Sequence, residues 1–141
     1  MFSFLYNAGK TGLLNGSIDL LLDTIKVALV GALYTADKDA HAFFDDVTNE
    51  VSGTGYTAGG KVIGNLSVAQ DNANDRAALH ADDLTWALAT FTARAAVIYK
   101  TTGNAATSPL IAFMDFGEDK IVSGEDFSLD WNSEGIFYLG E

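Results

Sequence analysis

The stretch NEVSGTGYTAGGKV, residues 49–62, allows two interpretations that predict different folds. Gly53, Gly55 and Ala58 match the G-x-G-x-x-G/A pattern of a dinucleotide-binding loop, which joins a strand to the start of a helix in an α/β protein. Here the residues that follow, KVIGNLSV, favour a strand, and the double glycine before them disfavours a helix start. We therefore predict a structural connection, with demanding backbone conformations at Gly53, Gly55, Gly59 and Gly60.

The rest of the chain predicts a fold rich in β-structure. Turn signals recur about every ten residues, with short apolar segments between them. In FSLDW, Phe127, Leu129 and Trp131 share one face of a strand and Ser128 and Asp130 the other, which is typical of a half-buried strand. We predict one domain over residues 1–141, mainly β, as an antiparallel β-sandwich or jelly-roll-like barrel with one or two short helices in the N-terminal third.

Individual elements can be placed along the chain. Residues 1–16 carry apolar side chains at helical spacing before Gly16, and they predict an N-terminal helical segment. The near-continuous apolar run within residues 23–35 predicts a strand buried on both faces, and a short helix or helical turn should follow within residues 35–47. The other predicted strands lie within residues 61–70, before Asp82, and at 91–99, 109–117, 126–131 and 135–140, the last two being joined by a turn.

Charge and composition exclude several classes of function. Eight Lys and Arg residues face 19 Asp and Glu residues, giving a net charge of −11. Such a chain repels phosphate backbones, so we expect no nucleic-acid partner; the surplus acid suits solubility, a basic partner surface or cation binding. The chain has no cysteine, which excludes disulfides and thiolate metal sites. We expect no signal peptide and no membrane partner, because the first residues lack a basic region and no apolar run is long enough to span a bilayer.

No motif in the chain is a complete catalytic signature. NAGKTG, residues 7–12, matches the end of a phosphate-binding loop, but Phe4 stands where the first glycine is required. DFG, residues 115–117, lacks the other parts of a kinase. The two histidines, His41 and His80, have no nucleophile motif beside them. We therefore predict a protein that is not an enzyme and that uses no cofactor.

Two further groups of side chains suggest binding roles. Six acidic residues fall within residues 115–130, but no calcium-loop pattern orders them, so we predict a solvated acidic rim and no metal site. Tyr56, Trp86 and Trp131 are candidate interface or stacking aromatics, and together with Tyr99 and Tyr138 they could form a sugar-binding platform. Aromatic side chains on strands are more often part of the core.

Several segments together resemble a family of small structural proteins of tailed bacteriophages. The resemblance starts in the strand IKVAL, continues through FDDV and EVSGTGYTAGG, and reaches ARAAVIYK, DFGED and DFSLDWNSEGIFYL in the same order. It covers residues 18–141, and the set is more specific than any single piece.

This resemblance implies a β-rich component of the virion, with no catalytic residues to carry over. Within such a family, capsid decoration is the expected role here, with a tail or neck component, or a carbohydrate-binding module on the virion surface, as alternatives. The expected partners are copies of the chain itself, in a homo-oligomer for which a trimer is one candidate, and the major capsid protein or other virion proteins. The expected location is the virion, assembled in the host cytoplasm.

Overall fold

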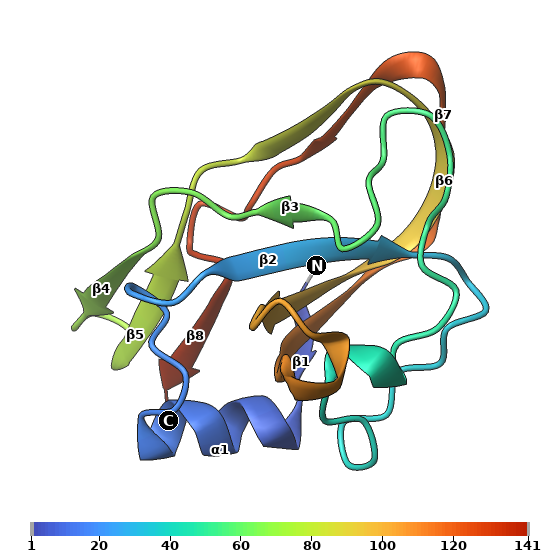
Figure 1. The fold of residues 1–141 in the computed structure, drawn as a ribbon. Helices are drawn as coiled ribbons and strands as arrows, with labels where there is room; N and C mark the ends of the chain where they lie inside the picture. Colours follow the sequence, from blue (N-terminus) through green and yellow to red (C-terminus); the bar gives the residue numbers. More distant parts are fainter. Residues whose placement is uncertain (1, 141) are drawn as a thin grey trace.

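The computed structural model describes residues 2–140, which form two antiparallel sheets and one α-helix near the N-terminus (Figure 1). The predicted mainly β, sandwich-like fold is therefore confirmed. One sheet has the strand order β1-β7-β6-β2-β3 and the other the order β4-β5-β8. The elements are β1 (Phe2–Leu5), α1 (Asn7–Asn15), β2 (Ile25–Val30), the 3-10 turn η1 (Phe44–Asp46), β3 (Lys61–Val62), β4 (Ser67–Asp71), β5 (Arg76–His80), β6 (Leu84–Lys100), the 3-10 turn η2 (Ala105–Thr107), β7 (Leu110–Leu129) and β8 (Phe137–Gly140).

Strand β2 is buried on both faces, as its sequence predicts. Ile25, Val27 and Leu29 belong to the larger of two apolar clusters, which lies between the two sheets. Ala28 and Val30 point the other way, into a second cluster that residues 31–47 help to cover. A strand with both faces in the core needs no polar alternation, which is why this segment is apolar almost throughout.

The predicted N-terminal helical segment is wrong in its first part. Phe2–Leu5 forms β1 and pairs with β7, and the Ser3 hydroxyl accepts a hydrogen bond from the Asp115 amide at 3.0 Å. The helix α1 begins only at Asn7 and ends, as predicted, before Gly16 in a left-handed conformation. The edge of β7 supplies backbone partners to the first residues, and this long-range pairing outweighs the local helical spacing.

The short helix or helical turn predicted within residues 35–47 is found as the 3-10 turn η1. The Asp37 carboxylate accepts hydrogen bonds from the amides of Asp39 and Ala40, and the Asp46 carboxylate accepts from those of Ala42 and Phe43. These carboxylates satisfy the backbone locally, and the amide groups are then not available for a longer helix.

Strands β6 and β7 form one long ribbon that bends sharply over the larger apolar cluster (Figure 1). The two predicted strands at 109–117 and 126–131 are both parts of β7, because Gly117 and Gly124 sit at irregularities within the strand and do not end it. Ala93 pairs with Lys120 and Ala95 with Asp115, so four β7 residues stand opposite Arg94 alone. Extra residues on one strand of a pair bend the ribbon at that point.

The second sheet is closed by β8, which pairs with β5 and not with β7. The predicted turn at 132–135 is found, with the Gly135 amide donating to the Asn132 carbonyl at 2.9 Å, and it joins strands that lie in different sheets. The Ile136 amide donates to the Leu79 carbonyl at 2.7 Å, and Phe137 is buried in the larger apolar cluster. Burial of these two side chains draws the end of the chain across to β5.

Candidate interaction surface

The glycine-rich connection, residues 50–60, runs from the end of β2 past β6 to β3. The Thr90 amide donates to the Thr54 carbonyl at 2.9 Å, which fixes the connection to the bent ribbon. A Cβ on Gly53 would collide with the Thr90 carbonyl and one on Gly60 with the Val27 carbonyl. The backbone φ is positive at Gly53, Gly55, Gly59 and Gly60, with values of 155°, 85°, 94° and 80°. Only glycine gives both the left-handed backbone and the close approach.

Hydrogen bonds made by Tyr56, Glu50 and Tyr99 fix the backbone of this connection. The Tyr56 hydroxyl donates to the Glu50 carboxylate at 2.6 Å and accepts from the Leu29 amide at 3.0 Å. The same carboxylate accepts from the Gly59 amide at 2.7 Å, and the Tyr99 hydroxyl donates to the Gly59 carbonyl at 2.6 Å. Burial, followed by the hydrogen bond to Glu50, raises the pKa of Tyr56 well above its usual range. The Gly59 amide is thus bonded to Glu50 and is not free to bind a phosphate. The connection also leads into the strand β3, whereas a dinucleotide-binding loop leads into a helix.

The three candidate aromatics do not form an exposed platform. Trp86 is 1% exposed, and the Tyr56 ring stacks over it at a centroid distance of 6.4 Å. The Lys61 ammonium lies 5.6 Å from the Trp86 ring, and Trp131 is half-buried with its indole N–H donating to the Asp82 carbonyl at 2.8 Å. A sugar cannot stack on a buried ring, so Tyr56, Trp86 and Trp131 do not form a stacking platform, and these rings belong to the core, as aromatic side chains on strands more often do.

The sequence NAGKTG lies in and around the first turns of α1. Gly9 and Gly12 are buried, and a Cβ on Gly9 would lie 2.8 Å from the Ile111 backbone. Lys10 is exposed, on the outer side of the helix. The two glycines thus let the helix approach β7 and residue Ile18 closely, which explains this glycine pattern without a phosphate ligand.

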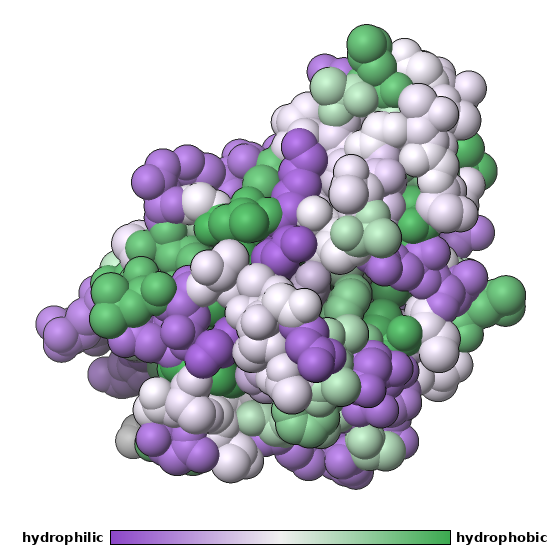
Figure 2. All heavy atoms as spheres, in the orientation of Figure 1, coloured by the Kyte–Doolittle hydropathy of each residue, from purple (hydrophilic) through white to green (hydrophobic). Residues whose placement is uncertain are grey.

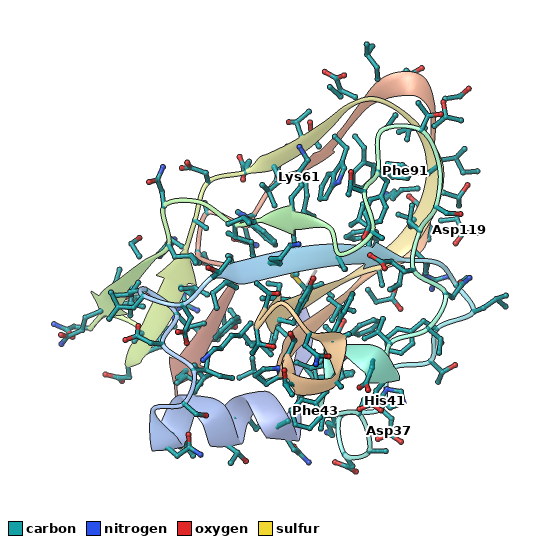
Figure 3. All side chains as sticks on the ribbon, in the orientation of Figure 1. Asp37, His41, Phe43, Lys61, Phe91 and Asp119 are labelled. Atoms are coloured by element: carbon teal, nitrogen blue, oxygen red, sulfur yellow. The ribbon has the colours of Figure 1, made fainter. Side chains whose placement is uncertain are left out.

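Asp115 and His41 are each bonded to other side chains of the protein. Asp115 forms an ion pair with Arg94 at 2.9 Å and accepts from the Gly117 amide at 2.7 Å; these two partners lower the pKa of its carboxyl. The Nδ1 atom of His41 lies 2.9 Å from the Tyr34 hydroxyl, which is 2.9 Å from the hydroxyl of buried Tyr6 (His41 is labelled in Figure 3). His80 lies on β5. Within residues 2–140, no three His, Asp or Glu side chains converge as a metal site.

Residues 87–92 and 117–126, which we call the ribbon bend, carry two exposed apolar side chains on their outer side. Leu88 is 71% exposed and Ile121 is 74% exposed, and Figure 2 shows hydrophobic surface at this end of the molecule. Leu88 has a φ of 48°, and its amide donates to the Asp126 carboxylate at 2.9 Å. A leucine in the left-handed region is strained by about 1–2 kcal/mol, and its side chain here gains little burial in return.

The surroundings of these two side chains are acidic. Glu118, Asp119, Glu125 and Asp126 are all exposed on β7, and the one cation among them, Lys120, is 2.7 Å from Glu118. Figure 3 shows Asp119 at the outer edge of the ribbon and Phe91 on its inner side. The ribbon bend therefore combines exposed apolar side chains with negative charge.

Leu88 and Ile121 were not predicted as interface residues, although the spacing of two aromatic residues beside Leu88 indicates a bulge in this strand. Trp86 and Phe91 are both buried in the same cluster, yet they are five residues apart. Residues an odd number apart on a regular strand point to opposite faces, so a bulge had to lie between them. Register confirms it: Trp86 pairs with Phe127 and Ala89 with Glu125, which leaves one extra residue on β6.

Comparison with protein-family models, curated proteins and solved structures finds no significant match to this chain. Among residues 2–140, neither the helix α1 nor a 3-10 turn has the length and apolar character that crossing a bilayer requires.

Proposed function

We propose that this protein is a structural subunit of a tailed-bacteriophage particle that binds neighbouring subunits through the ribbon bend. The proposal assigns it first to the capsid exterior, as a decoration protein, with a tail or neck position as the alternative. The order of the segments IKVAL, FDDV, EVSGTGYTAGG, ARAAVIYK and DFGED supports the class of protein. The observation that carries the mode of action is Leu88, which is exposed on a strained backbone.

The energetics of the bend favour a contact with another protein. Full burial of a leucine or isoleucine side chain is worth about 1.5–3 kcal/mol, and most of that gain is unrealised at Leu88 and Ile121 in the single chain. A complementary pocket on a neighbour would recover about 1–2 kcal/mol at each position. A single contact of this size is modest, but many copies arranged with particle symmetry add their contacts through avidity.

The charge of the bend indicates the chemistry of the neighbour. Asp119 and Glu125 lie in an acidic strand segment, so a surface with lysine or arginine around an apolar pocket would complement them. A second copy of the same bend would be repelled, because the exposed acids would then face one another. The contact is therefore expected to be head-to-tail or with a different virion protein.

Quantitative mass spectrometry of purified particles tests the proposal. The phage that encodes this chain should contain it in tens to hundreds of copies, and labelling in electron microscopy should place it on the capsid. The major capsid protein is the positive control and a replication enzyme of the same phage the negative one. A label confined to the tail would move the assignment to the alternative, and absence of the chain from washed particles would refute the proposed function.

A further inference from the structure

We propose that β4 is a dimerisation edge, at which two copies of this protein join their three-stranded sheets into one six-stranded sheet. This contact is separate from the ribbon bend and stands whether or not the protein is a virion component. Strand β4 forms one edge of the sheet β4-β5-β8, at the left of Figure 1. At five residues it is the longest of the four edge strands in the described part of the chain.

The strand has none of the features that normally prevent edge pairing. Soluble proteins block free edges with lysine, proline, bulges or inward charges. The residues Ser67, Val68, Ala69 and Gln70 are exposed and uncharged, and β4 pairs with β5 in continuous register without a bulge. Half of the backbone amide and carbonyl groups of such an edge strand point away from the sheet.

The charge on this edge suits a second copy of the chain. Each copy carries a net charge of −11, so two copies can approach closely only where the local charge is compensated. At the end of β4, the Asp71 carboxylate is 3.0 Å from the Arg76 guanidinium, and the hydrogen bond from the Asn74 side chain, followed by this pairing, lowers the pKa of Asp71. Arg76 also lies 3.5 Å from the Glu134 carboxylate and 4.2 Å above the Tyr138 ring. Residues 67–70 of the edge strand thus carry no charge, on a strongly acidic molecule.

The strand is also complementary to itself when it runs antiparallel. Pairing two copies about Ala69 places Val68 opposite Gln70 of the second copy and Ser67 opposite Asp71 of the second copy. No like charges then face each other, and a hydroxyl meets a carboxylate. A twofold axis through this point makes the same patch serve on both subunits.

Apolar side chains on one face of the sheet would be continued by the dimer. The register puts Val68, Leu79, Phe137, Ala77 and Leu139 on the same face. Leu79 and Phe137 are buried, whereas Val68 is 52% and Leu139 56% exposed. Figure 2 shows the hydrophobic surface over β4. In the dimer Val68 lies diagonal to its counterpart and opposite Gln70 of the second copy, so the apolar face continues across the new contact, whereas Leu139, on β8, stays at the far edge of each three-stranded sheet.

Charge substitutions at Ala69 test both the contact and its register. Sedimentation velocity over a range of concentrations should show a monomer–dimer equilibrium for the unsubstituted protein. Ala69→Lys and Ala69→Glu should each weaken dimerisation at least tenfold, because two like charges then lie opposite each other. An equimolar mixture of the two variants should dimerise again, because opposite charges now meet at the same position.

Matched controls keep the outcome clear. Ala106 is exposed in η2, and Ala106→Lys and Ala106→Glu make the same changes in net charge away from β4. These variants should dimerise as the unsubstituted protein does, and all four variants should keep its thermal unfolding temperature when compared at a concentration where every protein is monomeric. A protein that is monomeric at every concentration, or an equimolar mixture of the Ala69 variants that stays monomeric, would overturn the proposal. Neither result would bear on whether the chain is present in phage particles.

Discussion

Replacing Leu88 by glycine separates stability from assembly at the ribbon bend. Leu88 has a φ of 48° and is 71% exposed. Glycine removes the strain of the left-handed backbone, a gain of about 1–2 kcal/mol. It costs about 0.5–1 kcal/mol in the entropy of the unfolded chain, and the buried remainder of the side chain is worth roughly 0.5 kcal/mol. The free energy of unfolding should therefore change by less than about 1 kcal/mol, or roughly 3 °C in Tm.

The same substitution should weaken the contact with the neighbouring subunit. Loss of a leucine from a covering pocket removes about 1–2 kcal/mol of binding free energy, or about a five- to thirtyfold increase in Kd. The assay is binding of the purified variant to phage particles prepared without this protein, together with urea unfolding of the free variant. Ile121→Thr should weaken binding similarly, since Ile121 is 74% exposed on the same bend.

The control is an exposed leucine outside the ribbon. Leu33 is 83% exposed, and Leu33→Gly should leave particle binding unchanged. A loss of more than about 2 kcal/mol of stability in Leu88→Gly would show that the side chain holds the bend together, against the burial argument. Particle binding of Leu88→Gly equal to that of the unsubstituted protein would refute the role assigned to the bend.

Three further predictions concern folding and titration. Gly60→Ala should lower the free energy of unfolding by more than about 3 kcal/mol, because the new Cβ would collide with the Val27 carbonyl at a φ of 80°. Gly103→Ala, with a φ of 87° and open space around it, should lower it by only about 1 kcal/mol. Urea unfolding compares the two variants, and equal losses would contradict the collision. Backbone hydrogen bonds from Ala42 and Phe43 lower the pKa of Asp46 below 3.8. The stability that they supply is therefore complete above pH 3.8 and is lost as the pH falls through the lowered pKa. The difference in Tm between Asp46→Asn and the unsubstituted protein should shrink below pH 3.8, and a difference independent of pH would contradict this linkage. Burial, and then the charge of Glu50, raise the pKa of Tyr99 from 10.0 to about 12. Its contribution to the free energy of unfolding is therefore complete below pH 10 and is lost toward pH 12. Absorbance at 295 nm should show delayed tyrosine ionisation in the native protein, and ionisation of every tyrosine at the ordinary pKa would contradict the burial of Tyr99.

Local patterns predicted the fold class and several elements. The apolar run around β2 predicted burial on both faces, and the alternation at Phe127 and Leu129 predicted a half-buried strand; both are found. These signals depend on periodicity, which a single segment contains in full. The turn between β4 and β5 has the sequence DNAND, residues 71–75, whose polar turn residues act locally.

The errors arose where distant segments decide the outcome. β1 was predicted as helix because its pairing partner, β7, is more than a hundred residues away. β7 was divided into two strands because Gly117 and Gly124 end a strand in most contexts, but here they lie at bulges. Trp86 was a candidate for an exposed platform because a strand pattern shows which residues share a face but not which face is covered.

The pairing of β1 with β7 also has a consequence for synthesis of the chain. Phe2 pairs with Met114, and Leu79 with Phe137, so the first strand and the second sheet both wait for residues that are made much later. At about 5–20 residues per second, β1 remains without its partner for several seconds at least while the ribosome adds the intervening chain. Folding must then be completed after most of the chain has emerged, and contacts this distant in sequence form slowly. During this interval, Phe2 and Phe4 are exposed to chaperones and to other nascent chains.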